Sequence, residues 1–327
     1  ASKQKWLEAH GDTHWTHFYT DYGVGLQKRF LGHFLKGENT GWDKQPPVQL
    51  QIRHVNKFVE RHENEWPLAR TQWTKFFLDP NNKSLSPASS PQNASITYDP
   101  MGDGVTFMTP PLAADMEITG PVAAKIFVSS KSTDADIFLA LRLYAPDGKE
   151  IHFQGSNDPN TPIGLGWLRA SHRKLDPDMS QPWRPYHSHD ELRPLKPDDP
   201  VELDVEIWPT CIVAPAGYHI GLTVRGNDYH YGGPPLLTAG SKYEQTGVGP
   251  FVHDNANDRP KEIFGAPVFF CRRRYARIRR LRRGVAMHGA TAIQQRLNQR
   301  REMAGDAGLV DQQRFRDRKS TRLNSSH

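Results

Sequence analysis

The sequence VQLQIR at residues 48–53 alternates apolar and polar side chains. Alternation with a period of two puts every second side chain on the same face of a β-strand, so the stretch predicts a half-buried strand. Similar short runs occur at residues 72–78, 123–128, 137–144, 150–153, 201–208 and 219–224. Turn sequences such as APDG at 145–148 separate them, and this arrangement is typical of a β-sandwich or jelly roll.

We therefore expect residues 48–265 to form one mainly β, jelly-roll domain. Residues 156–200 lack the alternation and predict a long irregular excursion from it. The side chains expected to face inward are Val48, Leu50, Ile52, Phe127, Leu139, Leu141, Leu143, Val205, Ile207, Ile220, Leu222 and Val224.

Composition narrows the class of protein. The 327 residues include 26 Pro and 26 Gly, with a mean hydropathy of -0.70, which suits short strands and many turns. No run of about 18 apolar residues is present, so we expect no membrane partner, and the first residues do not resemble a signal peptide. Two cysteines, Cys211 and Cys271, predict free thiols, and we expect a soluble, cytoplasmic protein.

The first 47 residues have a different character. Residues 5–11 form a short strand-like run broken by glycine. Leu26, Phe30 and Phe34 follow at intervals of four, which predicts one apolar face of a helix over 23–36 that ends at Gly37. Residues 38–47 are polar and contain a Pro-Pro pair, so they predict a linker.

Several segments, each weak alone, occur together in a consistent order. They are KWLEAHGDTHWTHF at 5–18, LQKRFLGHFLKG at 26–37, WPL at 66–68, ITGP at 118–121, DAD at 134–136, PDG at 146–148 and AGYHI at 216–220. Residues 1 to about 265 resemble the C-terminal part of the CocE/NonD hydrolase family, serine hydrolases of the cocaine esterase and X-Pro dipeptidyl-peptidase type.

The resemblance implies a three-part enzyme with an α/β-hydrolase domain, an inserted helical lid and a galactose-binding-like jelly roll. Residues 1–37 would then be the C-terminal remnant of the hydrolase domain, 38–47 the linker, and 48–265 the X-Pro dipeptidyl-peptidase C-terminal-like jelly roll. The partners of this chain would be the missing N-terminal hydrolase and lid domains, and a homo-oligomer stays open. The substrate of the intact enzyme would be a small acyl ester or a peptide.

His14 is the candidate catalytic residue. In an α/β-hydrolase the histidine of the triad follows the last strand, and His14 stands three residues after Gly11, before the predicted helix. A histidine there would take the proton of a serine hydroxyl and return it to the leaving group. His10 and His17 flank it and are expected to be structural, and a solvated loop histidine is the alternative for His14 itself.

No nucleophile accompanies this histidine. The motif Gly-x-Ser-x-Gly is absent from the 327 residues, so we expect the chain alone to be inactive. The cluster His187-Ser188-His189-Asp190 lacks further spaced ligands, and we expect a hydrogen-bonded surface turn and no metal site. The sequence contains no nucleotide-binding fingerprint either, and no cofactor is expected.

The net charge of +6 comes from the C-terminal residues. Residues 266–327 contain 16 of the 42 basic residues and only 4 of the 36 acidic residues, and eight arginines fall within 271–283. The strand alternation expected after residue 265 is missing, so a reading-frame shift near Ala266 is expected, and residues 317–327 resemble a translated sequencing adapter. This Arg-rich tail could bind nucleic acid through charge alone, without sequence preference.

Two other functions stay open beside the hydrolase. The first is a free-standing, non-catalytic jelly-roll module that binds a carbohydrate or a protein. Trp66, Trp73, Trp167, Trp183 and Trp208 could line such a surface, although tryptophans more often pack in a core. The second is a nucleic-acid-binding protein that uses the Arg-rich tail, for which we expect no specific partner.

Overall fold

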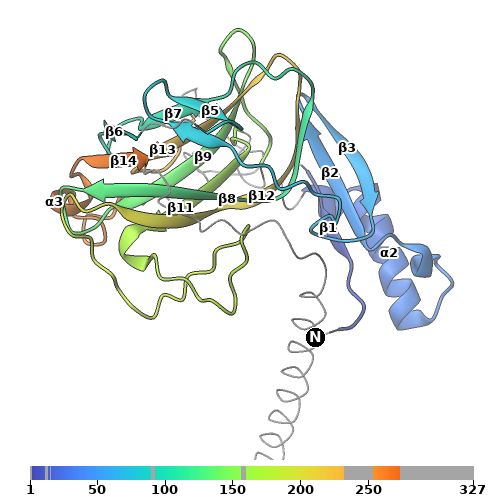
Figure 1. Ribbon diagram of the computed structural model, residues 1–327. Helices are drawn as coiled ribbons and strands as arrows, with labels where there is room; N and C mark the ends of the chain where they lie inside the picture. The colour runs from blue at the N-terminus through green and yellow to red at the C-terminus, as the bar shows by residue number, and fades with distance from the viewer. Residues whose placement is uncertain are drawn as a thin grey trace, which may run out of the picture. The chain divides into compact units, whose positions relative to one another are not determined.

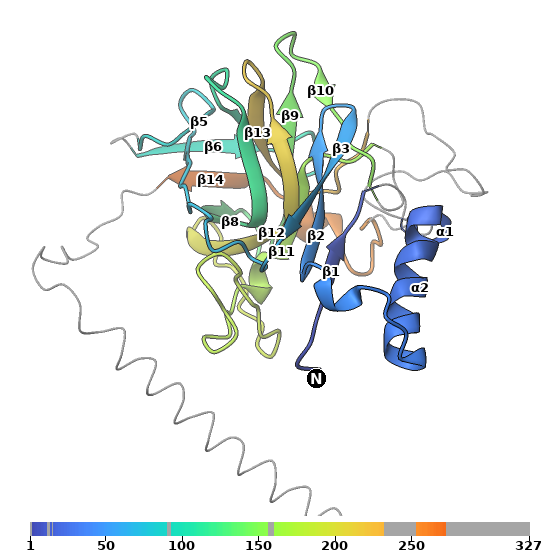
Figure 2. The ribbon, with the colours of Figure 1, turned by 90° about the vertical axis from the view of Figure 1, so that its right-hand side faces the viewer.

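A computed structural model describes residues 2–11, 14, 16–89, 93–155, 160–231 and 253–272. Two β-sheets dominate these residues, with few and short helices apart from α2 (Asp21–Lys36) (Figures 1 and 2). This confirms the predicted mainly β fold. Within the described ranges, no helix has both the length and the apolar character needed to cross a bilayer. The predictions for residues 273–327 lie outside the described residues.

Sheet A runs from the N-terminal residues into the sandwich. Its strands, in spatial order, are β1 (Leu7–Ala9), β2 (Val48–His54), β12 (Val201–Ala214), β8 (Met116–Ser130), β14 (Val268–Arg272) and β6 (Ala94–Tyr98), with β3 (Lys57–Glu63) also paired to β2. The long antiparallel pair of β12 and β8 forms its centre. β1 pairs with β2 in parallel, and a single parallel bridge between Ile212 and Arg53 joins β12 to β2.

Sheet B contains the other half of the sandwich. Its strands, in spatial order, are β10 (Glu150–Ile151), β9 (Asp136–Tyr144), β13 (His219–Arg225), β7 (Val105–Met108), β5 (Ser84–Ser86) and β4 (Phe77–Asp79), with β11 (Gly164–Arg169) also paired to β9. The remaining short elements are α1 (Thr16–Tyr19), η1 (Trp42–Lys44), η2 (Ala170–His172) and α3 (Lys261–Phe264).

The main core lies between the two sheets. On β12, Leu203, Val205 and Ile207 are buried, while the residues between them face outward, as the period-two pattern predicts. Leu139, Leu143 and Val224 of sheet B belong to the same core. Burial of one such aliphatic side chain stabilises the fold by about 1.5–3 kcal/mol.

One predicted core side chain is wrong. On β8, the neighbours Ile126 and Val128 fill the core, so Phe127 faces the opposite side of the sheet and is only half-buried. The stretch from 126 to 128 is apolar at every position, and the pattern therefore gave no signal for the register.

Strand β2, which contains the alternating sequence VQLQIR, packs into a separate hydrophobic cluster. Val48, Leu50 and Ile52 are all buried, but they form a second cluster, separate from the main core, with Ala9, Trp66, Cys211 and Val213. The inward direction of these three side chains is confirmed. Apart from Trp66, their neighbours come from β1 and from the far end of β12, because β2 lies between those two strands.

The expected end of the strand pattern at Ala266 is wrong. Residues Val268–Arg272 form β14, which pairs with β8 on one side and β6 on the other. Val268 and Phe270 are buried, and the Phe270 ring packs against Phe107 at 5.1 Å between centroids. The segment is an interior strand of sheet A, so the β domain extends beyond residue 265 to Arg272.

The expected irregular stretch 156–200 contains one regular strand. β11 pairs with β9 from Gly164↔Leu141 to Arg169↔Asp136. A Cβ at Gly166 would lie 2.1 Å from the carbonyl oxygen of Glu206, so glycine permits a close approach to β12 at this position. The two glycines that obscured the strand pattern are therefore part of how the strand packs.

Helix α2 begins at Asp21 and ends at Lys36, close to the predicted range. Thr20 caps its N-terminus by accepting a hydrogen bond from the Gly23 amide, and Gly37 ends it with a φ of 69°. The Phe30 and Phe34 rings contact an aromatic cluster with Trp42 and Trp6. Leu31 and Leu35 stay exposed, Leu35 to 77%.

Candidate functional site

His14 lies between β1 and α1, the short helix that precedes α2, and its side chain is exposed. The two flanking strands, β1 and β2, are parallel, with Leu7 opposite Val48 and Ala9 opposite Leu50. Parallel neighbours require a crossover, and α2 provides it, as Figure 2 shows. His14 therefore follows the end of a parallel strand, in the loop that leads into a crossover helix.

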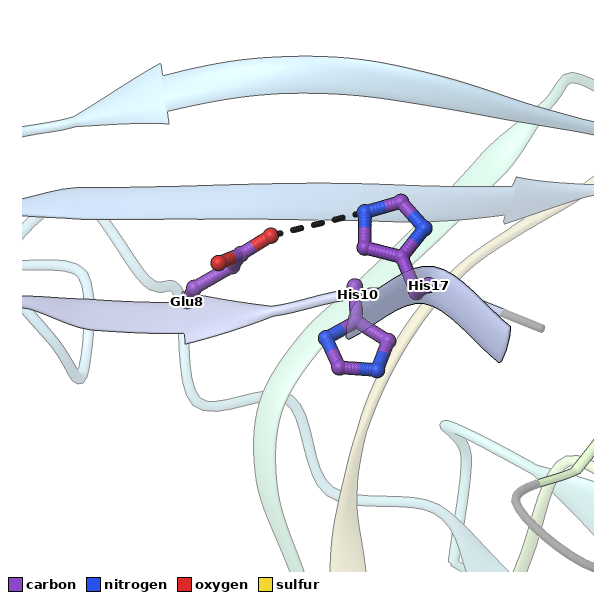
Figure 3. Close-up of side chains that lie close together, drawn as sticks. All are labelled: Glu8, His10 and His17. Atoms are coloured by element: carbon purple, nitrogen blue, oxygen red, sulfur yellow. Dashed lines mark ion pairs between the residues drawn. The ribbon is translucent and has the colours of Figure 1, made fainter. Parts of the chain in front are cut away.

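A polar cluster holds the two ends of this loop together. Glu8 on β1 and His17 on α1 face each other, with His17 Nε2 3.6 Å from Glu8 Oε1 (Figure 3). The His10 and His17 rings stack at 4.6 Å between centroids. Because His10 precedes His14 in the chain and His17 follows it, the stacked pair brings the residues on either side of His14 together.

Tyr22 extends the cluster toward sheet A. Its hydroxyl donates a hydrogen bond to Glu8 Oε1 at 2.9 Å and accepts one from Gln49 Nε2. Burial, and then the neighbouring Glu8 carboxylate, raise the pKa of Tyr22 well above its usual range. Tyr22 therefore acts as a neutral donor that orients Glu8, and Gln51 accepts a hydrogen bond from the Gly11 amide at the start of the loop.

Glu8, His10 and His17 also have the composition of a metal site. One ligand atom from each lies within 4.8 Å of the other two. However, a metal–nitrogen bond lies in the plane of the imidazole ring, and the planes of these two rings are only 13° apart. Nearly parallel, stacked rings cannot both direct a lone pair at one ion, so the arrangement suits loop support and would hold a metal only after one ring rotated.

The 187–190 segment is a hydrogen-bonded loop. Ser188 donates to the Asp190 carboxylate, which also pairs with Lys174 at 2.9 Å. These two hydrogen bonds, together with the Lys174 charge, lower the pKa of Asp190 to about 2. His189 lies 2.9 Å from His172 between their Nδ1 atoms. The side chains bind one another, in agreement with the expected surface turn.

The β-sandwich part of the chain matches a known protein family. Residues 40–258 match the family model of the X-Pro dipeptidyl-peptidase C-terminal non-catalytic domain. The chain belongs to this family.

Proteins with similar sequences include esterases, which match this chain over part of their length. A Mycobacterium bovis protein named as a serine esterase, Mb1866c, is 25% identical over 236 residues, which cover 61% of this chain and 35% of the relative. Cocaine esterase from a Rhodococcus species is 26% identical over 164 residues, which cover 38% of this chain and 28% of that enzyme.

A solved structure extends the likeness to the N-terminal residues. The CocE/NonD family hydrolase SACOL2612 from Staphylococcus aureus has a TM-score of 0.72 and 25% identity, covering 83% of this chain and 47% of that one. The chain thus corresponds to the C-terminal part of CocE/NonD hydrolases and spans about a third of the curated relatives it matches. The predicted family is confirmed.

The sequence analysis did not identify two of the side chains that lie close to the residues flanking His14. Glu8 and Tyr22 were not singled out, because they are 14 residues apart and belong to different elements. Their positions in a run of alternating strand residues and in the first turn of a helix could have suggested that both point toward the loop.

Proposed function

We propose that this chain is the C-terminal part of a serine hydrolase that cleaves ester or amide bonds by acyl transfer, with His14 as its general base. The observation that carries the proposal is the place of His14, in the loop between a parallel strand and its crossover helix. This is the position from which α/β-hydrolases present their histidine. The membership of the chain in a family of hydrolase C-terminal domains supports the same assignment.

In the proposed reaction His14 removes the proton from a serine hydroxyl as the oxygen attacks the substrate carbonyl. It then returns that proton to the leaving alcohol or amine, and a water molecule repeats the sequence to release the acid. The serine and the triad carboxylate would come from the preceding part of a longer protein. The stacked His10 and His17 rings and the Glu8–Tyr22 pair would keep the His14 loop in place.

We also propose that the hydrolase part continues beyond residue 37. β2 pairs in parallel with β1, and its side chains pack in a cluster distinct from the sandwich core. The β2–β3 hairpin would then complete the α/β-hydrolase sheet, and residues 38–47 would connect α2 to this last hairpin. The jelly roll would begin after β3.

The exposed apolar side chains of α2 fit this proposal. Leu31 and Leu35 are exposed to 46% and 77%, a large exposure for leucine on a helix. The preceding part of the hydrolase domain, with its lid, would cover them in the longer protein. The free thiol of Cys211, whose pKa burial raises to about 11, is consistent with a reducing, cytoplasmic location.

The experiment compares this chain with the protein encoded by its full gene. The longer protein is expected to hydrolyse p-nitrophenyl acetate, and His14→Ala should reduce kcat by at least about a hundredfold while the melting temperature stays the same. His62→Ala, on an exposed side chain of β3, is the matched control and should leave kcat unchanged. Residues 1–327 alone should show no turnover above a denatured sample.

Turnover by the chain alone that persists in His14→Ala would overturn the proposal. So would a longer protein in which His14→Ala has the kcat of the wild type.

A second candidate is a non-catalytic module that binds a carbohydrate or a protein. Trp167 and Trp208 favour it, because they are exposed to 43% and 59% and their rings lie 5.2 Å apart. Exposed aromatic pairs can stack on sugar rings. Quenching of tryptophan fluorescence by an oligosaccharide, lost in Trp208→Ala, would support this function.

A further inference from the structure

A polar cavity of about 550 Å³ is lined by residues of sheet B and its loops, and none of its lining residues precedes Asp103. Its lining includes Thr106 of β7, Arg142 of β9 and Arg225 at the end of β13, together with Glu150 and Tyr229. The volume lies in the range of small-molecule sites. The cavity belongs to the sandwich and contains no residue of the proposed catalytic loop.

The first cationic group in the cavity is already neutralised. Arg142 donates from Nε to Glu150 Oε1 at 2.8 Å and from Nη2 to the other carboxylate oxygen, while Nη1 donates to Thr223. Burial raises the pKa of Glu150, but hydrogen bonds from Arg142 and His152, with the Arg142 charge, outweigh it and lower that pKa to about 2. Tyr229 donates a further hydrogen bond to Glu150 at 2.8 Å.

The second cationic group has no such partner. Arg225 is 9% exposed, and its Nε donates to the Asn227 side-chain oxygen at 2.7 Å. Among the described residues no carboxylate lies within ion-pair distance of it, and no second hydrogen bond of its guanidinium is present. Burial lowers the pKa of Arg225, with Asp103 acting in the opposite direction from a longer distance. The remaining N–H donors of Arg225 are not among the buried atoms without a partner, so they open into the cavity, where an anion could accept hydrogen bonds from them.

The charges of the cavity favour an anion with a single negative charge. Arg142, Arg225 and Lys149 are cationic and Asp103 and Glu150 anionic, so the lining has a net charge of +1 with its histidines neutral. A monoanion balances that charge, whereas a phosphate dianion would be repelled by the two carboxylates. Guanidinium groups bind carboxylates through two parallel hydrogen bonds.

We propose that this cavity binds a small hydroxylated carboxylic acid, about the size of a monosaccharide, whose carboxylate pairs with Arg225. The hydroxyl groups of the ligand would meet the polar lining, and the Tyr231 ring, which stands edge-on to His152 at 4.8 Å, would cover one face of the ligand. The inference does not depend on the proposed hydrolase activity.

The test uses isothermal titration calorimetry on residues 1–327 with glucuronate as the probe. Glucose, which has the same ring without the carboxylate, and glucose 6-phosphate, which carries a dianion, are the matched ligands. Saturable binding is expected for glucuronate at roughly millimolar concentrations, with no comparable binding of glucose or glucose 6-phosphate. Arg225→Gln should weaken glucuronate binding about tenfold or more, since it removes one charged pair.

Arg184→Gln is the control, because it removes the same charge from an exposed position outside the cavity, and it should change the affinity less than twofold. Circular dichroism melts establish that Arg225→Gln folds, and the comparison of glucuronate with glucose on the wild type needs no variant. No saturable binding of glucuronate up to roughly 20 mM would overturn the proposal. Equal binding of glucose, or wild-type affinity in a folded Arg225→Gln, would overturn it as well.

Discussion

Asp136 receives a hydrogen bond from Arg259 Nε at 2.8 Å, and both side chains are less than 10% exposed. The same carboxylate accepts two more from Arg169, at 2.9 and 3.1 Å. Asp136 begins β9, Arg169 ends β11, and Arg259 precedes α3. One buried carboxylate thus connects two strands of sheet B to the segment that leads into β14.

Asp136→Asn should destabilise the fold by about 3–5 kcal/mol, because it leaves the buried Arg259 guanidinium with an uncompensated charge, while Arg169 keeps Asp258 as a partner. Urea denaturation measures the change. Asp258→Asn is the control: its carboxylate also pairs with Arg169, at 3.1 Å, but is 61% exposed, so its loss should cost at most about 1 kcal/mol. Equal effects of the two variants would contradict a role for burial.

Gly166→Ala should destabilise the protein by about 1–3 kcal/mol, because the added Cβ meets the carbonyl oxygen of Glu206 and forces β11 away from β12. Gly25→Ala in α2 provides a control of opposite sign. Nothing lies within 4 Å of its added Cβ, and alanine should stabilise the helix by about 0.5–1 kcal/mol. The melting temperatures of the two variants test whether the steric clash of the added Cβ or the lost flexibility of glycine determines the change in stability.

The lowered pKa of Glu150 should make the free energy of unfolding fall at acidic pH. Its pKa in the folded protein is about 2, below the ordinary 4.5, so its contribution is present above about pH 4.5 and is lost as the pH falls toward 2. The shift corresponds to at most about 3 kcal/mol. Glu150→Gln should flatten the fall of unfolding free energy over this range, measured by urea denaturation at several pH values, and an unchanged slope would contradict it.

Truncation at two positions should distinguish the contribution of β14 to stability from that of the residues after it. A protein that ends at residue 265 loses β14 and should melt at a markedly lower temperature or fail to fold, because Val268 and Phe270 leave the core and β6 loses its neighbour. A protein that ends at residue 272 keeps every described strand and should melt like the full chain. Equal melting temperatures of the two truncated proteins would show that β14 contributes nothing.

The sequence was most informative where one face of a strand is buried. Leu203, Val205 and Ile207 alternate with charged neighbours, so both the strand and its inward face could be predicted. Phe127 was assigned to the wrong face because its neighbours are equally apolar, and β14 was missed because a short apolar strand runs directly into arginines. β11 was hidden by glycines whose purpose depends on the distant Glu206.

The candidate functional residues also differ in how far the sequence could predict them. His14 could be proposed because the resemblance to CocE/NonD hydrolases indicates which strand and helix flank the histidine of the triad, and its catalytic role stays a prediction. Arg225 could not, since nothing near it in the sequence indicates that its guanidinium lies in a cavity with the charges of β9 and β10. Pairing between distant strands determines which charges meet, and a period-two pattern contains no information about it.

The position of β14 in sheet A determines when the domain can finish folding during synthesis. β6 leaves the ribosome more than 170 residues before its only strand neighbour in the described chain, and β8 also waits for that neighbour along one edge. At about 5–20 residues per second, the nascent chain therefore spends on the order of ten seconds with an unpaired strand edge and an unfilled core position opposite Phe107. During that interval the newly made protein is exposed to chaperones and to aggregation, until β14 completes the sheet.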